Sequence, residues 1–245
     1  QRELTEKIIS VMDIDRRYLT VGETEHPFTT SFTKKDTRIT THYYESDVAS
    51  SLYSVIHEGG HALYDMNSDD SLFGSSLEGG VSMGIHESQS RFYENIIGRS
   101  LPFCEVLLPI LRGTFPGRFD KACAEDIYRA VNRSQPSLIR TEADELTYSL
   151  HIMIRYELEK MMFDGVITAH DLPHEWNRLY KEYLGIDVPD DKHGVLQDSH
   201  WAGAAIGYFP SYALGSAYGA QYLCEMKKDF DVDAAVRSGK LTQIN

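Results

Sequence analysis

The chain has 245 residues, of which 42% are hydrophobic and 25% are charged. This composition is typical of a globular protein with one substantial core or two small ones. The formal net charge of −13 excludes nucleic-acid binding, which rests on basic patches that neutralise phosphates. The sequence has no run of 18 or more apolar residues, so it predicts no membrane span.

The N-terminal stretch, QRELTEKIIS, has neither an initiator Met nor the apolar segment of a secretory signal peptide. It is polar and already helical in pattern, so we expect the chain to begin inside a larger protein. Three cysteines, Cys104, Cys123 and Cys224, are odd in number and widely spaced. We expect reduced thiols in a cytosolic protein rather than disulfides or a metal cluster.

Apolar residues at helical spacing predict an amphipathic helix over residues 1–19. Residues 28–44 are rich in Thr, Phe and Tyr with alternating character, and the polar triplet KKD lies in their middle. This segment predicts a β-hairpin with a short polar turn. A helix is then expected from Asp47, a good N-cap residue, to Met66.

The rest of the chain is mainly helical in pattern. We expect further helices over residues 78–99, 103–113, 119–132, 140–163 and 171–184. Gly, Pro and Asp between 185 and 200 predict an exposed loop, and residues 201–229 return to a helical pattern. The predicted fold class is therefore mainly α, with one small antiparallel sheet.

The strongest chemical signal is VIHEGGHALYD, which contains His57, Glu58 and His61. Positions i and i+4 of a helix share a face, so both imidazoles can reach one ion. Glu58 lies about 100° round the helix from His57, close enough to touch a water on that ion. This is the HExxH arrangement of two zinc ligands and a general base. The composition, with 10 His, gives about 0.03 such motifs by chance.

The alternative interpretation of this motif is two surface histidines on an ordinary helix. The apolar residues on both sides of it favour a buried catalytic helix instead. Gly59 and Gly60 each cost the helix about 1 kcal/mol relative to Ala. We therefore expect another backbone, or the substrate, to approach closely there.

A catalytic zinc has three protein ligands and an open position for water. The candidates for the third ligand are Asp65, Glu78, His86, Glu87 and Glu94. Asp65 follows His61 by one helical turn, so it is also placed to hold a ligand imidazole by its second nitrogen.

We choose Glu87 as the third ligand, which gives a site of His57, His61, Glu87 and water. Glu87 lies on a separate predicted helix 26 residues after His61, with enough loop between for the two helices to pack side by side. Glu78 and Glu94 are then expected to be solvated or to support the ligands.

Five further motifs accompany the HExxH core. They are HPF at residues 26–28, DxRxT at 36–40, HES-Q at 86–89, IRxxAD at 139–144 and GxxQDxHW at 194–201. In this set and order the chain resembles the M32 family of metallocarboxypeptidases, the carboxypeptidase Taq type. In that family the HES-Q element carries the third metal ligand, which here is Glu87.

The resemblance implies a neurolysin-like gluzincin fold with a deep substrate groove, a homodimer, and zinc as the metal, with Co²⁺ also able to support activity. It implies removal of single C-terminal residues, with broad specificity, from peptides with a free C-terminus in the cytoplasm. Family members are longer, so residues 1–245 are expected to be the catalytic region, with N- and C-terminal parts of the family fold lying outside this sequence.

In this mechanism Glu58 takes a proton from the attacking water and passes one to the leaving amine. Donors must also stabilise the oxyanion, and His200 and Tyr208 are the candidates. Asp198 is expected to help hold the His200 imidazole. Tyr208 resembles the tyrosine that related gluzincins place beside the carbonyl oxygen, and Tyr212 is the next candidate. Ordinary core or groove positions are the alternative for both tyrosines.

The terminal carboxylate of the substrate calls for an arginine, whose forked guanidinium binds a carboxylate through two hydrogen bonds. We favour Arg140 and place Arg38 second, with Gln197 and Tyr212 also assigned to substrate binding. The remaining candidates, Arg91, Arg112, Arg118 and Arg155, are expected to be surface or structural residues. The hairpin edge is also open to an extended peptide, and His26 and His42 either line that groove or are structural.

Two alternatives to a carboxypeptidase remain open from sequence. One is an endopeptidase or dipeptidase of a neighbouring gluzincin family. The other is a non-catalytic or metal-poor fragment of such an enzyme. Comparing cleavage of a peptide with a free and with an amidated C-terminus distinguishes a carboxypeptidase from an endopeptidase or dipeptidase. Metal analysis of the chain and of a His57→Ala variant tests whether it is a metal-poor fragment.

Overall fold

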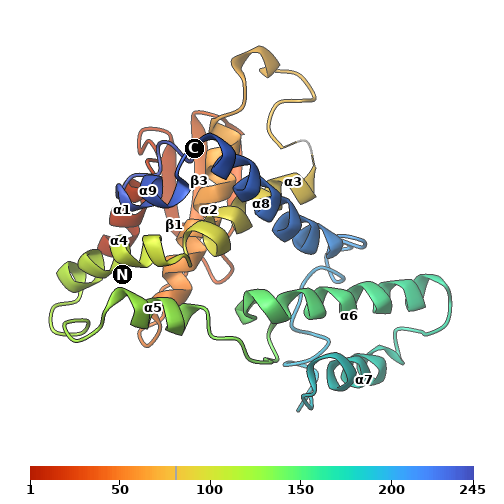
Figure 1. Cartoon of the computed structure of the whole chain (residues 1–245). Helices are drawn as coiled ribbons and strands as arrows, with labels where there is room; N and C mark the ends of the chain where they lie inside the picture. Colours follow the sequence, from red (N-terminus) through yellow and green to blue (C-terminus); the bar gives the residue numbers. More distant parts are fainter. Residues whose placement is uncertain (81) are drawn as a thin grey trace. The chain divides into compact units, whose positions relative to one another are not determined.

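A computed structural model describes residues 1–80 and 82–245 of the chain (Figure 1). The chain divides into two compact units. The first comprises Gln1–Val131 and Gly215–Asn245, and the second comprises Asn132–Leu214. The expectation of a mainly helical fold with one small sheet is confirmed. In the described part of the chain, no helix is long and apolar enough to cross a membrane.

The first unit begins with helix α1 (Arg2–Val11), whose buried face includes Leu4, Ile8 and Ile9. The predicted helix over residues 1–19 is too long. Asp13 has a φ of 56°, in the left-handed region that a helix cannot continue through. The chain then enters strand β1 (Leu19–Glu23), which the sequence analysis missed.

A three-stranded sheet follows, with strand order β1-β3-β2. Strands β2 (Thr29–Thr33) and β3 (Asp36–Thr41) pair antiparallel, with Lys34 and Lys35 between them, so the predicted hairpin is confirmed. Strand β1 pairs parallel with β3, which makes the sheet mixed rather than purely antiparallel. Hydrophobicity patterns do not reveal this pairing, because a parallel partner comes from a separate part of the chain.

Helix α2 (Val48–Met66) is the centre of the first unit and packs against β3, α1 and α3. Its start is as predicted: the Asp47 side chain accepts hydrogen bonds from the backbone N–H groups of Ala49 and Ser50. This cap satisfies donors that the first helical turn leaves unpaired. A short 3₁₀ turn, η1 (Asp70–Leu72), follows in the loop after α2.

Helix α3 (Met83–Arg91) continues directly into the π-helix η2 (Phe92–Ile97). The predicted helix over 78–99 therefore starts too early, although position 81 lies outside the described residues. Ser82 caps α3 by accepting from the Ile85 N–H, and Gly79 has a φ of 79°, which no helix allows. π-helical segments inside helices often occur at functional sites.

The other helices of the first unit are α4 (Leu101–Thr114), α5 (Ala124–Val131) and α9 (Val232–Arg237), of which α9 was not predicted. Helix α8 (Pro210–Asp229) belongs to this unit from Gly215 on. The helical pattern from residue 201 does not become helix before Pro210. Ala204 and Gly207 both have positive φ, which interrupts any helix over 201–209.

The second unit contains a 3₁₀ turn, η3 (Arg140–Glu142), and helices α6 (Glu145–Phe163) and α7 (Leu172–Leu184). Helix α6 starts five residues later than predicted, because Asp144 caps it by accepting from the backbone N–H groups of Leu146 and Thr147. Helix α7 agrees with prediction, and residues 185–200 form a loop as expected, but Gly194 and the Asp198 side chain in it are buried rather than exposed. Helices α6 and α7 bury a core of Ile154, Leu158, Trp176, Leu179, Tyr180 and Leu184.

Candidate metal centre

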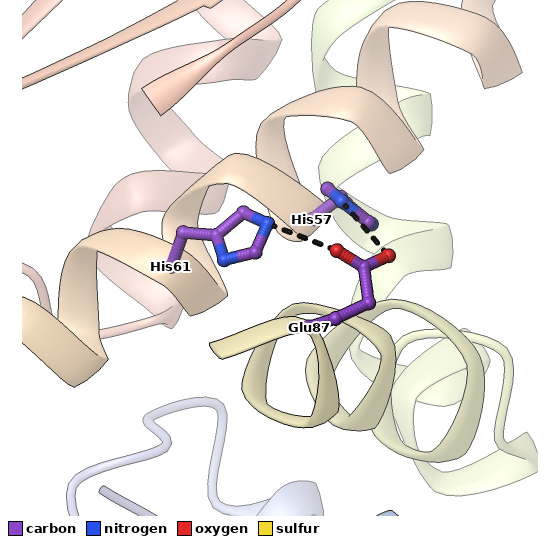
Figure 2. Close-up of side chains that lie close together, drawn as sticks. All are labelled: His57, His61 and Glu87. Atoms are coloured by element: carbon purple, nitrogen blue, oxygen red, sulfur yellow. Dashed lines mark ion pairs between the residues drawn. The ribbon is translucent and has the colours of Figure 1, made fainter. Parts of the chain in front are cut away.

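Helices α2 and α3 bring His57, His61 and Glu87 together (Figure 2). The two imidazoles project from successive turns of α2 toward the Glu87 carboxylate on α3. Nε2 of His57 lies 3.8 Å from Oε1 of Glu87, and Nε2 of His61 lies 3.5 Å from Oε2. One ligand atom from each of the three residues lies within 4.8 Å of the others.

Close helix packing places Glu87 opposite the two histidines. A Cβ atom on Gly60 would lie 2.7 Å from Cα of Ser90 and 2.9 Å from the carbonyl oxygen of Gln89. On the other side of α3, a Cβ on Gly215 of α8 would lie 3.0 Å from the backbone of Glu87. The expected close approach of a backbone at the two motif glycines is therefore found at Gly60. At Gly59 the neighbour is the Met12 side chain instead.

The hydrogen bond of His57 uses Nδ1, so Nε2 is the atom that can bind a metal. Nδ1 of His57 lies 2.9 Å from Oε2 of Glu94. Burial works against ionisation, but the hydrogen bond from His57 and the nearby positive charges lower the pKa of Glu94 to about 2. Glu94 can then only accept, so the imidazole proton is on Nδ1. Arg99 holds Glu94 in turn, with its Nη2 3.1 Å from Oε1.

His61 is oriented through a second histidine. Its Nδ1 lies 2.7 Å from Nδ1 of His86, whose Nε2 lies 3.0 Å from Oδ1 of Asp65. Burial opposes ionisation of Asp65, but hydrogen bonds from His86 and Ser31 lower its pKa. His86 therefore donates to Asp65 and accepts from His61, which leaves the His61 Nε2 lone pair facing Glu87. The sequence suggested direct contact between Asp65 and the His61 imidazole, but Asp65 reaches His61 only through His86.

Negative charge exceeds positive charge at this centre. Burial disfavours the imidazolium form of His57, yet the carboxylates of Glu87, Glu94 and Glu58 outweigh it and raise the pKa of His57 to about 9. Burial likewise works against ionisation of Glu87, but His57 and His61 lower its pKa to about 2. The arrangement thus favours a cation between the two imidazoles and the carboxylate.

The residues fit a zinc ion. In a tetrahedral site with metal–ligand distances of about 2.0–2.2 Å, ligand atoms lie about 3.3–3.6 Å apart. The two His–Glu distances of 3.8 and 3.5 Å are close to this. Glu87 is only 3% exposed, and its Oε1 has no hydrogen-bond partner among the described residues. A buried carboxylate oxygen without a hydrogen-bond partner is unusual, and a bound metal ion would explain it.

Glu58, the predicted general base, lies on α2 beside His57 and is 6% exposed. Its Oε2 accepts a 2.6 Å hydrogen bond from the Thr29 hydroxyl of β2. The hairpin thus fixes one oxygen of a carboxylate that adjoins the metal ligands.

Several other candidates in the first unit lie away from this centre or have other partners. Glu78 accepts from the Gly74 N–H in the loop before α3. Arg38 pairs with Asp36, and it lies opposite Thr30 in the sheet, on the face away from Thr29. Nδ1 of His42 is 3.1 Å from the Thr24 carbonyl oxygen, Arg91 donates to Ser216, and Arg112 donates to carbonyl groups between 119 and 122.

The predicted oxyanion donors cluster within the second unit. Nε2 of His200 lies 2.9 Å from the Tyr212 hydroxyl, and the His200 and Tyr208 rings lie 5.4 Å apart. The Tyr208 and Tyr212 rings meet edge to face at 5.2 Å. Nδ1 of His200 is 3.9 Å from Asp198, too far for the hydrogen bond that we expected. Tyr212, the second choice among the tyrosines, is therefore bonded to His200.

Arg140 is buried, with 5% exposure, and joins two of the motifs. Its Nε and Nη2 both lie 2.9 Å from Oδ1 of Asp198, and its backbone N–H donates to Gln197. The fully buried Arg155 binds the other oxygen of Asp198 and also donates to Gln197. Two guanidinium groups thus share one carboxylate. We predicted that Arg140 opens a helix. It lies instead in the 3₁₀ turn η3 before α6.

The sequence analysis missed three supporting residues, Thr29, Ser31 and Arg99, and left Arg155 open as either a surface or a structural residue. Thr29 and Ser31 alternate on one strand, and their polar character is ordinary for an exposed hairpin. Arg99 lies beyond the end of η2 and follows Glu94 by five residues, a spacing that the i,i+3 and i,i+4 pairs of a regular helix do not predict. Arg155 lies in a largely apolar stretch of α6, and this was the one available signal that it is buried.

The whole chain, residues 1–245, matches the family described as Carboxypeptidase Taq (M32) metallopeptidase. The chain belongs to this family. The recognition from six short motifs is therefore confirmed, and with it the class of metallopeptidase.

Named relatives of this M32 chain are carboxypeptidases. It is 46% identical over 245 residues to Carboxypeptidase 1 of Bacillus subtilis (strain 168), covering 100% of this chain and 49% of that protein. It is 47% identical over 204 residues to Thermostable carboxypeptidase 1 of Pyrococcus furiosus, covering 83% of this chain and 41% of that protein. The chain therefore spans about half the length of the relatives it matches.

The M32 fold is equally clear from solved structures. The crystal structure of the M32 carboxypeptidase from Deinococcus radiodurans R1 superimposes with a TM-score of 0.94 at 39% identity. The match covers 100% of this chain and 50% of that one.

Proposed function

We propose that the chain is the catalytic region of a zinc-dependent carboxypeptidase of the gluzincin type, which releases single C-terminal residues from peptides with broad specificity. One observation carries the proposal. Nε2 of His57, Nε2 of His61 and the buried carboxylate of Glu87 converge, while the Nδ1 atoms of both histidines are held by other acceptors. Zinc is the metal that this donor set favours, and Co²⁺ suits the same ligands.

A zinc ion held by His57, His61 and Glu87 would supply a polarised water whose pKa is lowered toward about 7. Glu58 accepts the proton of that water as it attacks the peptide carbonyl, and then donates a proton to the leaving amine. Its Oε2 is held by Thr29, so Oε1 is the oxygen assigned to proton transfer. His200 and Tyr208 are assigned as donors to the developing oxyanion, and removal of such a donor costs about 10²–10³ in rate.

The substrate's terminal carboxylate is assigned first to Arg140, with Gln197 and Tyr212 beside it and Arg38 as the second choice. Arg140 and Arg155 share the single carboxylate of Asp198, which leaves positive charge for an anionic group. Arg38 is the more exposed arginine, at 51% of its side chain, but the carboxylate of Asp36 already pairs with its guanidinium.

Two substrates that differ only at the C-terminus test the proposal. A carboxypeptidase removes residues from a peptide with a free C-terminus and leaves the amidated form intact. Equal cleavage of both peptides would refute carboxypeptidase action and favour a related endopeptidase. A Glu58→Gln variant is expected to keep its zinc and to lose kcat by about 10²–10⁴-fold. Substantial retained activity would remove Glu58 from the role of base.

The remaining expectations belong to the same proposal. The protein acts on peptides in the cytoplasm, binds neither nucleic acid nor membrane, and forms a homodimer in its full-length form. A sedimentation measurement tests the oligomeric state. A chain that binds no zinc and cleaves neither peptide would identify it as a non-catalytic fragment.

A further inference from the structure

Strand β2 presents two hydroxyl groups to α2. The Thr29 hydroxyl donates to Oε2 of Glu58 at 2.6 Å, and the Ser31 hydroxyl donates to Oδ2 of Asp65 at 2.6 Å. Residues two apart on a strand share a face, so both side chains project from the same side of the hairpin. Neither residue belongs to any of the six motifs.

We propose that β2 is a positioning strand, whose Thr29 orients the base Glu58 and whose Ser31 orients the metal ligand His61 through Asp65 and His86. The Thr29 role rests on the function proposed above. The Ser31 role rests only on the metal centre. Both side chains act through other residues, so they are positioning residues rather than catalytic ones.

The Thr29 contact selects one carboxylate oxygen of Glu58. The hydroxyl has one proton and lies 2.6 Å from Oε2 but 3.1 Å from the Glu58 carbonyl oxygen, so the shorter contact is its main hydrogen bond. This bond restrains carboxylate rotation and leaves Oε1 for the proton transfer that the proposed mechanism assigns to Glu58. A hydrogen bond to a charged group contributes about 1.5–3 kcal/mol, equivalent to about 10–100-fold in rate if it acts mainly on orientation in the transition state.

The Ser31 hydrogen bond belongs to a series of hydrogen bonds that connects β2 with His61. Ser31 donates to Asp65, His86 donates to Asp65 from Nε2, and His61 donates to His86 from Nδ1. Every donor in the series points toward the Asp65 carboxylate, so the arrangement has a single consistent set of proton positions. It fixes His61 with its Nε2 lone pair toward Glu87.

The surroundings of His86 restrict its ring to this position. The Tyr64 ring meets it edge to face at 5.1 Å, and the His61 ring lies 4.7 Å away. A Cβ atom on Gly80 would lie 2.4 Å from Cδ2 of His86, so the loop packs directly against the ring. Because His86 cannot move easily, loss of its partner on either side changes the hydrogen bonding rather than the location of the ring.

Zinc affinity, measured by competition with a chelating dye, tests the Ser31 arm without any assay of activity. Loss of such a supporting partner costs about 10–100-fold in metal affinity. We expect this loss in His86→Phe, a smaller loss of up to about 10-fold in Ser31→Ala, and none in Thr30→Val. Thr30 is the matched control, because it lies between the two hydroxyls and faces the other side of the sheet. His86→Gln serves if His86→Phe does not fold, as judged by thermal unfolding without metal.

Peptidase kinetics test the Thr29 arm. Thr29→Val, which removes only the hydroxyl, is expected to lower kcat by about 10–100-fold with KM and zinc affinity unchanged. Thr29→Ser, which keeps the hydroxyl, is expected to restore most of kcat. A uniform loss in both variants, or a loss of zinc, would overturn the role assigned to Thr29.

The outcomes separate the positioning proposal from the proposed function. Wild-type zinc affinity in Ser31→Ala would overturn the Ser31 role, and wild-type affinity in the folded His86 variant would overturn the link through His86; both results would leave the zinc site intact. A wild-type chain that binds zinc but cleaves no peptide would overturn the proposed function and the Thr29 role, and the affinities would still decide the Ser31 role. A wild-type chain that does not bind zinc would overturn both the proposed function and the positioning role of β2.

Discussion

Gly60→Ala should disrupt the metal centre, although it changes no ligand. The added Cβ would lie 2.7 Å from Cα of Ser90, whereas ordinary contacts begin at 3.4 Å. The obstacle is backbone, so relief requires α2 and α3 to separate by about 0.7 Å, the difference between these two distances. Glu87 lies on α3, and zinc sites tolerate about 0.2 Å in ligand distance. We expect zinc affinity to fall at least about 10-fold.

The effect on stability has two opposing parts. Alanine favours the helix by about 1 kcal/mol over glycine. Overpacking a tight contact costs about 1–3 kcal/mol. The free energy of unfolding of metal-free Gly60→Ala should therefore fall by about 0–2 kcal/mol, a small change beside the loss of zinc binding.

Gly59→Ala is the matched control for this prediction. Its Cβ would lie 2.8 Å from Cε and Sδ of Met12, the end of a flexible side chain that can move aside. Zinc affinity should stay at the wild-type value, and stability should change by less than about 1 kcal/mol. Chelator competition and urea unfolding measure both quantities. Equal zinc affinity in the two variants would refute the close α2–α3 contact as the feature that places Glu87.

Three further predictions concern buried charge. Asp198→Asn leaves two buried arginines without their carboxylate and should cost about 3–5 kcal/mol of unfolding free energy, whereas Asp187→Asn, in an exposed pair, should cost less than about 1 kcal/mol. Burial and the neighbouring arginines lower the pKa of His151 to about 3. The unfolded chain, with a His pKa near 6.5, then binds more protons between these values, so stability falls as pH drops through this window. Urea titrations should show a shallower fall in His151→Phe, and an equal slope would refute the neutral buried His151. Glu94→Gln should weaken zinc binding by about 10-fold, measured by chelator competition, and unchanged affinity would remove Glu94 as the support of His57.

The candidate metal site could be predicted from sequence because its HExxH part is local in the chain. His57, Glu58 and His61 occupy one helix, where the spacing alone determines which side chains meet. Glu87 needed one further step, the packing of two helices joined by a loop. The hairpin and the Asp47 cap were predictable for the same reason, since turn and cap residues act on their immediate neighbours.

The supporting contacts are not local, and this is why sequence did not reveal them. His86 was a candidate ligand by residue type, but only the packing of α3 against α2 shows that it bonds to His61 instead. Strand β1 depends on a parallel partner that comes from another part of the chain. Arg155 was left open as a surface or a structural residue, and only the folded chain shows that it shares Asp198 with Arg140.

The metal centre is tested most directly by anomalous diffraction at the zinc edge from crystals of the protein. We predict one peak bounded by Nε2 of His57, Nε2 of His61 and the carboxylate of Glu87, about 2.0–2.2 Å from each. A peak held by other residues, or no peak at this position in protein that contains one zinc per chain, would contradict the site.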